Sequence, residues 1–339
     1  MKLSSPDDIE KKTLLILRTL RDSRQTLGAR LIARRMSEQG TRMSERTVRY
    51  HLRLMDERGL TRLAGRRDGR VITETGLDEL ANARVRDKLG LAISRIEVLA
   101  FRTTFDPKGK QGLLPVNISF FPKGGFRKAL EAMQPAFRAG LCVSDLVAVA
   151  GAGEKLGEVT VPEGRVGLAT VCSIVVNGVL LKNGIPMDSK FGGILQMSKG
   201  KPLRFVELIY YSGSSLDPSE AFIQARMTSV KDAARRGDGR ILANFREVPA
   251  PSRSLVESII LDFRKAGIHG VLSMGEVGEP ICEVPVDLNK IGLILIGGMN
   301  PVCCTREAGI ESENKAMSTI MNFEELIPFR SVITMKKYS

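Results

Sequence analysis

The sequence has 339 residues and a formal net charge of +13, with 43% hydrophobic and 26% charged residues. A chain of this length exceeds what one hydrophobic core usually supports, so we expect two or three domains, and the composition excludes a disordered or fibrous protein. The charge is uneven: residues 1–90 hold 21 Lys and Arg against 13 Asp and Glu, whereas residues 91–339 hold 30 against 25. This basic N-terminal excess indicates a polyanionic partner, although a merely solvated basic surface would have the same composition.

Cysteine usage and hydropathy favour a cytoplasmic protein. The cysteine count of five is odd, and the start MKLSSPDD lacks a basic and apolar leader, which predicts a reducing compartment. The longest apolar run, Val166 to Leu181, contains Gly, Ser, Asn and Thr and is shorter than the ~20 residues of a membrane span. We therefore expect no transmembrane segment.

Three helices are predicted in the first 75 residues. Apolar residues at helical spacing predict a helix from Ile9 to Leu20, and a second from Ala29 to Gln39 ends at Gly40, a residue favoured after a helix C-terminus. Ser44 is a good N-cap for a third helix, which ends at Gly59. One face of that helix is apolar and is formed by Val48, Leu52 and Met55.

A basic hairpin follows the third helix. Strands are expected at Thr61 to Leu63 and at Arg70 to Thr73, joined by the glycine-rich tip Ala64 to Gly69. Three helices and a basic hairpin in this order predict a winged helix-turn-helix domain, residues 1–75, whose third helix enters the major groove of double-stranded DNA. The alternative is that its arginines only solvate the surface or pair with Glu45, Asp56 and Glu57. The predicted DNA contacts are Ser44, Arg46, Thr47, Arg49, Tyr50, Arg53, Arg66, Arg67 and Arg70.

After a predicted helical linker, residues 76–90, the sequence repeats itself. At an offset of 125, Gly167 meets Gly292 and Lys190 meets Lys315; at an offset of 127, Asn117 meets Asn244. We therefore predict an internally duplicated α/β sensor module with copies at residues 91–215 and 216–339, in a mixed α/β (α+β) protein.

Each copy is expected to contain a helix, a strand around the paired Asn, a long helix and further strands. A buried strand is predicted at Val166 to Val176 and at Ile291 to Ile296, each followed by a helix. In the second copy Asn300 is the expected N-cap, with Pro301 at the first helical position. In the first copy Asn177-Gly178 would also suit a hairpin turn, but the repeat favours a helix.

The strand-to-helix junctions of the two copies are the candidate ligand site. Thr170 to Ser173 and Gly297 to Asn300 offer hydroxyl, thiol and backbone NH groups, and helix N-termini favour anions. Two related halves commonly bind a small ligand in the crevice between them, so a small anionic metabolite is expected. Alternatively, the glycines merely permit close packing.

The sequence contains no recognisable catalytic or metal-binding motif. The two histidines fall in different predicted domains, and the sequence contains neither CxxC pairs, a Walker motif nor a strand-linked dinucleotide fingerprint. We expect no enzyme, no metal and no cofactor. The alternative is a metabolite-transforming enzyme with a nucleic-acid-binding appendage, using Cys172 or Cys142 as nucleophile and His269 as base.

Several long motifs carry a family resemblance. The segments SERTVRYHLRLMDERGLT, AGLCVSDLV, GLATVCSI, SKFGG, RMTSV, ILANFREVPA and GGMNP resemble the archaeal nitrogen-regulation repressor family, NrpR, over nearly the whole chain. The winged helix is also similar to that of ribonuclease R. The NrpR resemblance implies a homodimeric repressor that binds palindromic operators and is released by the dianion 2-oxoglutarate. Many members carry two sensor units where this chain carries one, which leaves the subunit arrangement and the nitrogen role open.

Effector contacts follow from that ligand class. Lys190 and Arg246 would bind carboxylates, and hydroxyl groups with Asn300 would orient the ligand. The expected effector-binding residues are Thr103, Thr104, Cys172, Ser173, Lys190, Thr228, Ser229, Arg246 and Asn300.

Overall fold

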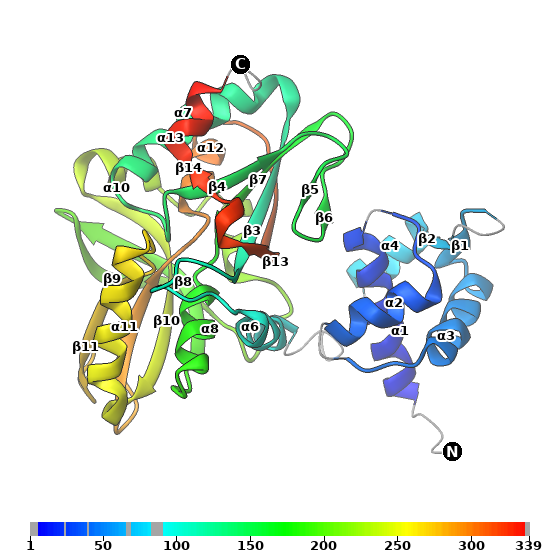
Figure 1. Ribbon diagram of the computed structural model, residues 1–339, viewed down its shortest axis with the longest axis horizontal. Helices are drawn as coiled ribbons and strands as arrows, with labels where there is room; N and C mark the ends of the chain where they lie inside the picture. Colours follow the sequence, from blue (N-terminus) through cyan, green and yellow to red (C-terminus); the bar gives the residue numbers. More distant parts are fainter. Residues whose placement is uncertain (1–5, 24, 39–40, 66–68, 83–90, 336–339) are drawn as a thin grey trace. The chain divides into compact units, whose positions relative to one another are not determined.

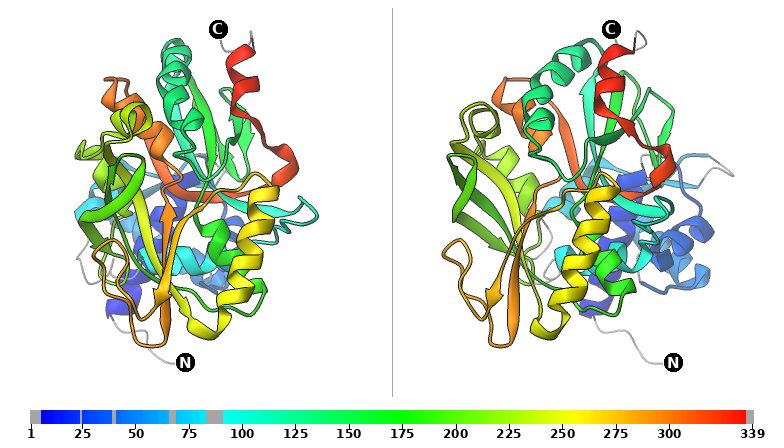
Figure 2. Two further views of the ribbon diagram at one scale, coloured as in Figure 1. Left: turned by 90° about the vertical axis from the view of Figure 1, so that its left-hand side faces the viewer. Right: turned by 60° about the vertical axis from the view of Figure 1, so that its left-hand side comes forward.

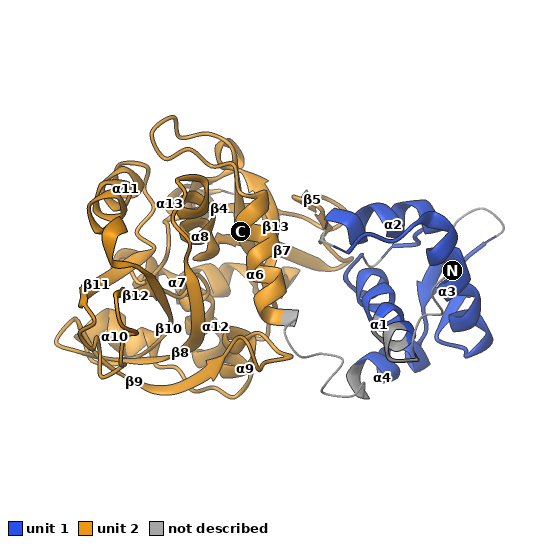
Figure 3. Cartoon of the chain, turned by 90° about the horizontal axis from the view of Figure 1, so that it is seen from below, with its two compact units in different colours: residues 1–91 blue, residues 92–339 orange. Residues whose placement is uncertain are grey.

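The computed structural model describes residues 6–23, 25–38, 41–65, 69–82 and 91–335. The chain divides into two compact units, residues 1–91 and 92–339, which are coloured separately in Figure 3. None of the helices in the described ranges is long and apolar enough to cross a bilayer.

The first unit has the predicted winged-helix order of elements. Its core consists of the apolar faces of the helices, including Ile16, Ile32 and Leu52, which are fully buried. Leu80 packs against this core, so the helix expected to begin the linker belongs to the compact unit. The elements are α1 (Pro6–Ser23), α2 (Ala29–Glu38), α3 (Glu45–Glu57), β1 (Thr61–Leu63), β2 (Arg70–Ile72) and α4 (Glu74–Asn82).

The second unit contains two five-stranded antiparallel sheets, shown in Figures 1 and 2. Sheet 1 has the strand order β13-β3-β7-β4-β14, and sheet 2 has the order β11-β12-β10-β8-β9. The strands are β3 (Leu113–Pro122), β4 (Leu146–Ala150), β7 (Arg165–Val171), β8 (Asp188–Ser198), β9 (Lys201–Tyr210), β10 (Gly239–Pro249), β11 (Val271–Val277), β12 (Lys290–Ile296), β13 (Glu313–Asn322) and β14 (Ile327–Pro328), with a small hairpin of β5 (Lys155–Leu156) and β6 (Val159–Thr160).

Helices and short 3-10 turns connect these strands. The 3-10 turns η1 and η2 each follow the proline that ends a strand, Pro122 or Pro249. The helices are α6 (Leu91–Arg102), α7 (Phe126–Arg138), α8 (Ile174–Lys182), α9 (Pro218–Gln224), α10 (Val230–Arg236), α11 (Arg253–Lys265), α12 (Asn300–Glu307) and α13 (Phe329–Thr334), and the 3-10 turns are η1 (Lys123–Gly125), η2 (Ala250–Ser252) and η3 (Phe323–Glu325).

One order of elements occurs twice in this unit. The series β3-η1-α7-β4-β7-α8-β8 is followed by β10-η2-α11-β11-β12-α12-β13. Helices α7 and α11 both have 13 residues and both end at an Ala-Gly step, whose glycines, Gly140 and Gly267, have φ of 68° and 78°. Glycine is favoured there because it adopts this left-handed conformation without a steric penalty. The boundary between the copies at residues 215 and 216 remains a prediction.

The two series exchange their last strands. Strand β8, which ends the first series, pairs with β10 of the second, and β13, which ends the second, pairs with β3 of the first. Each sheet therefore contains strands from both halves, and one hydrophobic core spans them. The second unit is one structural body rather than two separable modules.

The strand-to-helix junctions of the halves lie against each other. A Cβ added to Gly298 would lie 2.3 Å from the carbonyl oxygen of Val171 and 2.7 Å from Nδ2 of Asn117. Ser144 and Ile268 form a β-bridge between the halves. Gly298 therefore permits the close packing of the two junctions, as one of the two interpretations of the sequence expected.

Two local predictions differ from the structure at these junctions. Strand β7 ends at Val171 rather than Val176, because the chain turns at Cys172 into α8. Asn177-Gly178 lies inside α8, which confirms the helix over the hairpin turn. The N-cap of α12 is Met299 and not Asn300, whose side-chain amide instead pairs with the backbone of Leu242 at 2.7 and 3.0 Å.

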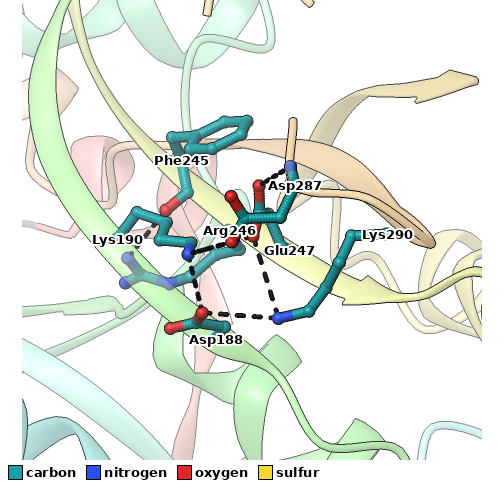
Figure 4. Close-up of polar contacts among 7 residues, drawn as sticks. All are labelled: Asp188, Lys190, Phe245, Arg246, Glu247, Asp287 and Lys290. Carbon is teal, nitrogen blue, oxygen red and sulfur yellow. Dashed lines mark hydrogen bonds and ion pairs between the residues drawn. The ribbon is translucent and has the colours of Figure 1, made fainter. Parts of the chain in front are cut away.

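An ion cluster fixes the β11–β12 connection to sheet 2 (Figure 4). The Nζ atom of Lys190 lies 2.7 Å from a carboxylate oxygen of Asp287, 2.9 Å from Asp188 and 3.1 Å from Glu247. Lys290 approaches Asp188 at 3.4 Å and Glu247 at 3.8 Å. The three carboxylates have the spacing of a metal site, but the Lys190 ammonium lies among them and supplies the positive charge.

Substituting Gly298→Ala is expected to destabilise the protein by about 1–3 kcal/mol, because the new methyl group meets backbone atoms that have no rotamer to change. Chemical denaturation followed by circular dichroism measures this. Gly124→Ala is the matched control, since nothing lies within 4 Å of its added Cβ. Equal stability of the two variants would contradict the close approach of the junctions.

Substituting Lys190→Met is expected to cost about 2 kcal/mol of unfolding free energy, because Glu247, 1% exposed, loses its nearest cation. Lys290→Met should cost less, since its contacts are longer. Burial alone would lower the pKa of Lys190, but hydrogen bonds with Asp287, Asp188 and Glu247 hold the pKa above its usual range.

A raised lysine pKa also fixes the pH dependence. The contribution of Lys190 to the free energy of unfolding is complete below the usual lysine pKa. It is lost as the pH rises through the raised pKa of the folded protein. Wild type should therefore lose stability relative to Lys190→Met above about pH 10.5. Denaturation curves that stay parallel for the two proteins across that range would disprove the assignment.

Candidate DNA-binding surface and effector site

Helix α3 separates a buried face from a basic one. Val48, Leu52 and Met55 are fully buried, and His51 is 3% exposed and packs edge-on to the Tyr50 ring. The opposite side carries the exposed predicted contacts Arg46, Arg49, Tyr50 and Arg53. Ser44 serves as the N-cap, and its hydroxyl accepts a hydrogen bond from the amide of Thr47 at 3.1 Å. Ser44 and Thr47 thus fix the start of the helix that presents the arginines.

The arginines of this face are held only by weak ion pairs. Arg49 pairs with Glu45 and Arg53 pairs with Glu57, each four residues apart, and the two arginine side chains are 70% and 80% exposed. Exposed pairs of this kind contribute little to stability. Arg46 makes no ion pair with any residue that the structure describes. These guanidinium groups are therefore available to phosphates or guanine edges.

The arginines of the β1–β2 hairpin differ from those of α3 in what the structure shows of their contacts. Nε of Arg70 lies 2.7 Å from Asp56, which also accepts the Thr61 hydroxyl at 2.6 Å, so Arg70 joins the hairpin to α3. This matches the alternative that an arginine pairs with Asp56, although Arg70 keeps a partly exposed side chain. Arg66 and Arg67 lie outside the described residues.

Six of the nine expected effector residues have their polar groups bonded to other parts of the chain. Asn300 pairs with Leu242 and Lys190 lies among three carboxylates, as described above. The hydroxyl of buried Thr103 donates to the Leu99 carbonyl at 2.8 Å, and that of Thr104 accepts from an amide at 3.0 Å. Thr228 donates to Glu307 at 2.8 Å, and Ser229 accepts from the Arg240 amide at 2.9 Å.

The other three, Cys172, Ser173 and Arg246, lie in one buried region. Nδ2 of Asn244 donates to the Ser173 hydroxyl at 3.2 Å, and the Tyr211 hydroxyl donates to Oδ1 of Asn244 at 2.6 Å. The guanidinium of Arg246 covers the Tyr211 ring, 4.6 Å from its centroid. We call Arg246, Tyr211, Asn244, Ser173, Asn177 and Ser189 the buried polar cluster; each is at most 7% exposed.

Arg246 has few partners for a buried charge. It is 1% exposed, and Nη1 donates to the carbonyl of Phe245 at 3.3 Å (Figure 4). Nη2 approaches the Tyr211 hydroxyl at 3.5 Å. Nε has no hydrogen-bond partner. No ion pair joins Arg246 to a carboxylate of the described residues. The pKa values of Cys172 and Tyr211 respond both to Arg246 and to Asp217, so a carboxylate lies within electrostatic range of the same groups.

A second unsatisfied group lies in the same cluster. Asn177 of α8 donates from Nδ2 to the Ser189 hydroxyl at 3.0 Å, while its Oδ1 has no partner. Ser189 is directly opposite Arg246 in the β8–β10 pairing. The sequence analysis did not name Tyr211, Asn244, Asn177 or Ser189, which the structure places in this cluster. The pairing of Asn244 with Asn117 in the repeat was the one signal that pointed here.

Cys172 is in the wrong protonation state for a nucleophile. Burial, with a smaller contribution from Asp217, raises its pKa to about 12, so the thiol stays protonated near neutral pH. Burial likewise raises the pKa of Cys142 to about 12. The carboxylate of Asp217 accepts the amides of Ser219 and Glu220 at the start of α9.

Family models match both units of the chain. The model of the NrpR regulatory domains NRD1 and 2 matches residues 89–327, and the ribonuclease R winged-helix domain matches residues 14–80. The global nitrogen regulator NrpRI of Methanosarcina mazei is 40% identical over 318 residues, which is 94% of this chain and 98% of the relative. The chain also matches the global nitrogen regulators NrpR of Methanococcus maripaludis and Methanocaldococcus jannaschii, at 30% and 32% identity.

The lengths differ in those last two comparisons. The alignments cover 92% and 97% of this chain but only 54% and 58% of the two relatives, so the chain spans about half their length. A crystal structure of a nitrogen repressor-like protein from Methanococcus jannaschii has a TM-score of 0.60 and 28% identity, covering 70% of this chain and 98% of that one. With a winged helix before the matched regulatory domains, the chain belongs to the NrpR family of nitrogen regulators.

Proposed function

We propose that this protein is a transcriptional repressor of nitrogen-related genes that binds a palindromic DNA operator as a homodimer and is released by 2-oxoglutarate. The observation that carries the DNA-binding part is the exposed arginine face of α3, opposite its buried apolar face. The effector part is supported by the buried polar cluster, where the Nε donor of Arg246 has no hydrogen-bond partner. The proposed place of action is the cytoplasm.

The proposed dimer is supported by the small number of base pairs that one winged helix contacts. A single recognition helix contacts few base pairs, whereas two helices on half-sites one or more helical turns apart raise affinity and specificity together. The spacing of the half-sites then depends on the geometry of the second unit. A ligand that favours another geometry of this unit lowers operator affinity by shifting the population of dimers away from the DNA-compatible form.

The alternative enzymatic function has less support. A cysteine nucleophile requires a thiolate, and burial raises the pKa of both Cys172 and Cys142 to about 12. The relatives that cover most of this chain are named as regulators. The same buried polar groups serve a binding site without any requirement for ionised sulfur.

The double variant Arg49→Ala, Arg53→Ala should lose at least ~100-fold in operator affinity, since each base or phosphate contact contributes about 1–3 kcal/mol. Its melting temperature should stay unchanged, because only exposed ion pairs are removed. Gel-shift titration on the protein's own promoter measures the affinity. Arg204→Ala, an exposed arginine of the second unit, is the control. Wild-type affinity of the double variant would refute the proposed reading face.

Addition of 2-oxoglutarate should release heat or absorb it in a calorimetric titration and should weaken the gel shift. Because protein–DNA affinity falls with salt, sodium chloride at equal ionic strength is the control, and it should weaken the shift less. Absence of binding heat together with an unchanged gel shift would eliminate 2-oxoglutarate as the effector.

A further inference from the structure

We infer that a pocket between α7 and α13 binds one free α-amino acid with an apolar side chain. The pocket has a volume of about 310 Å³, at the lower end of the range for small-molecule sites. No member of the buried polar cluster lines it, so this site is separate from the proposed effector site. The groups that carry the inference are Phe137, Arg138, Asp145, Phe329, Arg330 and Ile333.

The walls of the pocket are fixed by contacts between α13 and the elements beside it (Figure 1). Nη1 of Arg127 in α7 donates to the Ile333 carbonyl at 2.6 Å, and the Phe329 amide donates to the backbone carbonyl of Asp145 at 2.8 Å. The rings of Phe137 and Phe329 stack with their centroids 3.9 Å apart. Because these contacts are made within the folded chain, the pocket is formed before a ligand arrives.

One part of the lining is apolar. Phe329 is buried, while Phe137 and Ile333 are only half-buried and leave apolar surface open to the pocket. An aliphatic or aromatic group that covers this surface is removed from water together with it, which favours binding. The lining therefore accepts the side chain of an apolar ligand.

The other part of the lining is charged. Arg138 is in the last turn of α7, Arg330 is in α13, and Asp145 directly precedes β4. All three side chains are exposed, and none makes an ion pair with a residue in the described ranges. A guanidinium binds a carboxylate through two parallel hydrogen bonds, and a carboxylate accepts from an ammonium group. Both charges of an α-amino acid thus have a partner in the pocket, whereas the second carboxylate of a dicarboxylic acid would face Asp145.

The sister half of the second unit has no equivalent pocket. At the offset of 127, Phe137 and Arg138 of α7 correspond to Arg264 and Lys265 of α11. In sheet 1, β4 pairs with β14, which leads directly into α13, but the corresponding strand β11 is the outermost strand of sheet 2. Within the described residues, α11 therefore lacks the cover that α13 gives α7. The duplicated fold yields one site per chain, and Lys265 is a matched control position for Arg138.

Calorimetric titration of L-phenylalanine and of L-leucine into the full chain tests the site. At least one of them should bind saturably, one molecule per chain, below about 10 mM, a weak range suited to a ligand of about a dozen heavy atoms. The double variant Arg138→Met, Arg330→Met should bind at least ~10-fold more weakly, the range expected when charged hydrogen bonds are lost. Lys265→Met should bind as wild type does.

The deaminated acid 3-phenylpropanoate tests the role of Asp145. Asp145→Asn should weaken the binding of the amino acid but not that of 3-phenylpropanoate, because only the amino acid has an ammonium group. An excess of 2-oxoglutarate should not displace the amino acid. Without ligand, the variants should melt within about 2 °C of wild type, since they remove exposed side chains that make no ion pair.

Four results would each overturn the inference. They are no saturable binding of either amino acid, wild-type binding by the double arginine variant, an equal loss of binding in Lys265→Met, and displacement of the amino acid by 2-oxoglutarate. A large fall in the melting temperature of the arginine variant would also overturn it, because the arginines would then serve the fold. These measurements are made without DNA, so their failure leaves the proposed repressor function untouched.

Discussion

The exchange of β8 and β13 between the two halves is the constraint on which the second unit depends. Buried strands must have their backbone amides and carbonyls paired on both edges. Strand β3 pairs with β7 and β10 pairs with β12 of the same half, and each obtains its second neighbour from the opposite half. The close approach of Gly298 to Val171 follows from this exchange, since the strands bring the two junctions together. The two halves of the second unit are therefore joined through shared sheets as well as through the chain.

The sequence allowed much of the fold to be predicted, because the signals were local or repeated. Helical periodicity and glycine punctuation located α2 and α3 to within about two residues, and the offset of 125 identified the helix containing Asn177-Gly178 against a plausible turn. The exchange of strands was not predictable in this way. Pairing partners such as β13 and β3 are almost 200 residues apart, and neither composition nor repeat offset states which copy supplies the edge of a sheet.

The effector residues remain a prediction, and the structure adds the partners of their polar groups. Hydroxyl, amide and ammonium groups at the junctions were treated as available to a ligand, but their partners come from remote segments. Asn300 bonds Leu242, and Thr228 bonds Glu307. Lys190 has the right charge for a carboxylate ligand, yet three carboxylates of the chain already surround it. Lys190 and Arg246 are distinguished only by the hydrogen-bond and ion-pair partners that the folded structure gives each of them.

That difference between the two cations determines which of them an anionic ligand would favour. A charge that is already neutralised, as in Lys190, gains little from a ligand, because the ligand must first displace an equally good partner. Arg246, by contrast, makes no ion pair among the described residues, so an anion that reached it would have no carboxylate to displace. A ligand shifts a conformational equilibrium only by the difference between its affinities for the two states, not by the total strength of its contacts. Arg246 lies on β10, which is hydrogen-bonded both to β8 of the first half and to β12 of the second, so a change at this side chain would act where the two halves are joined.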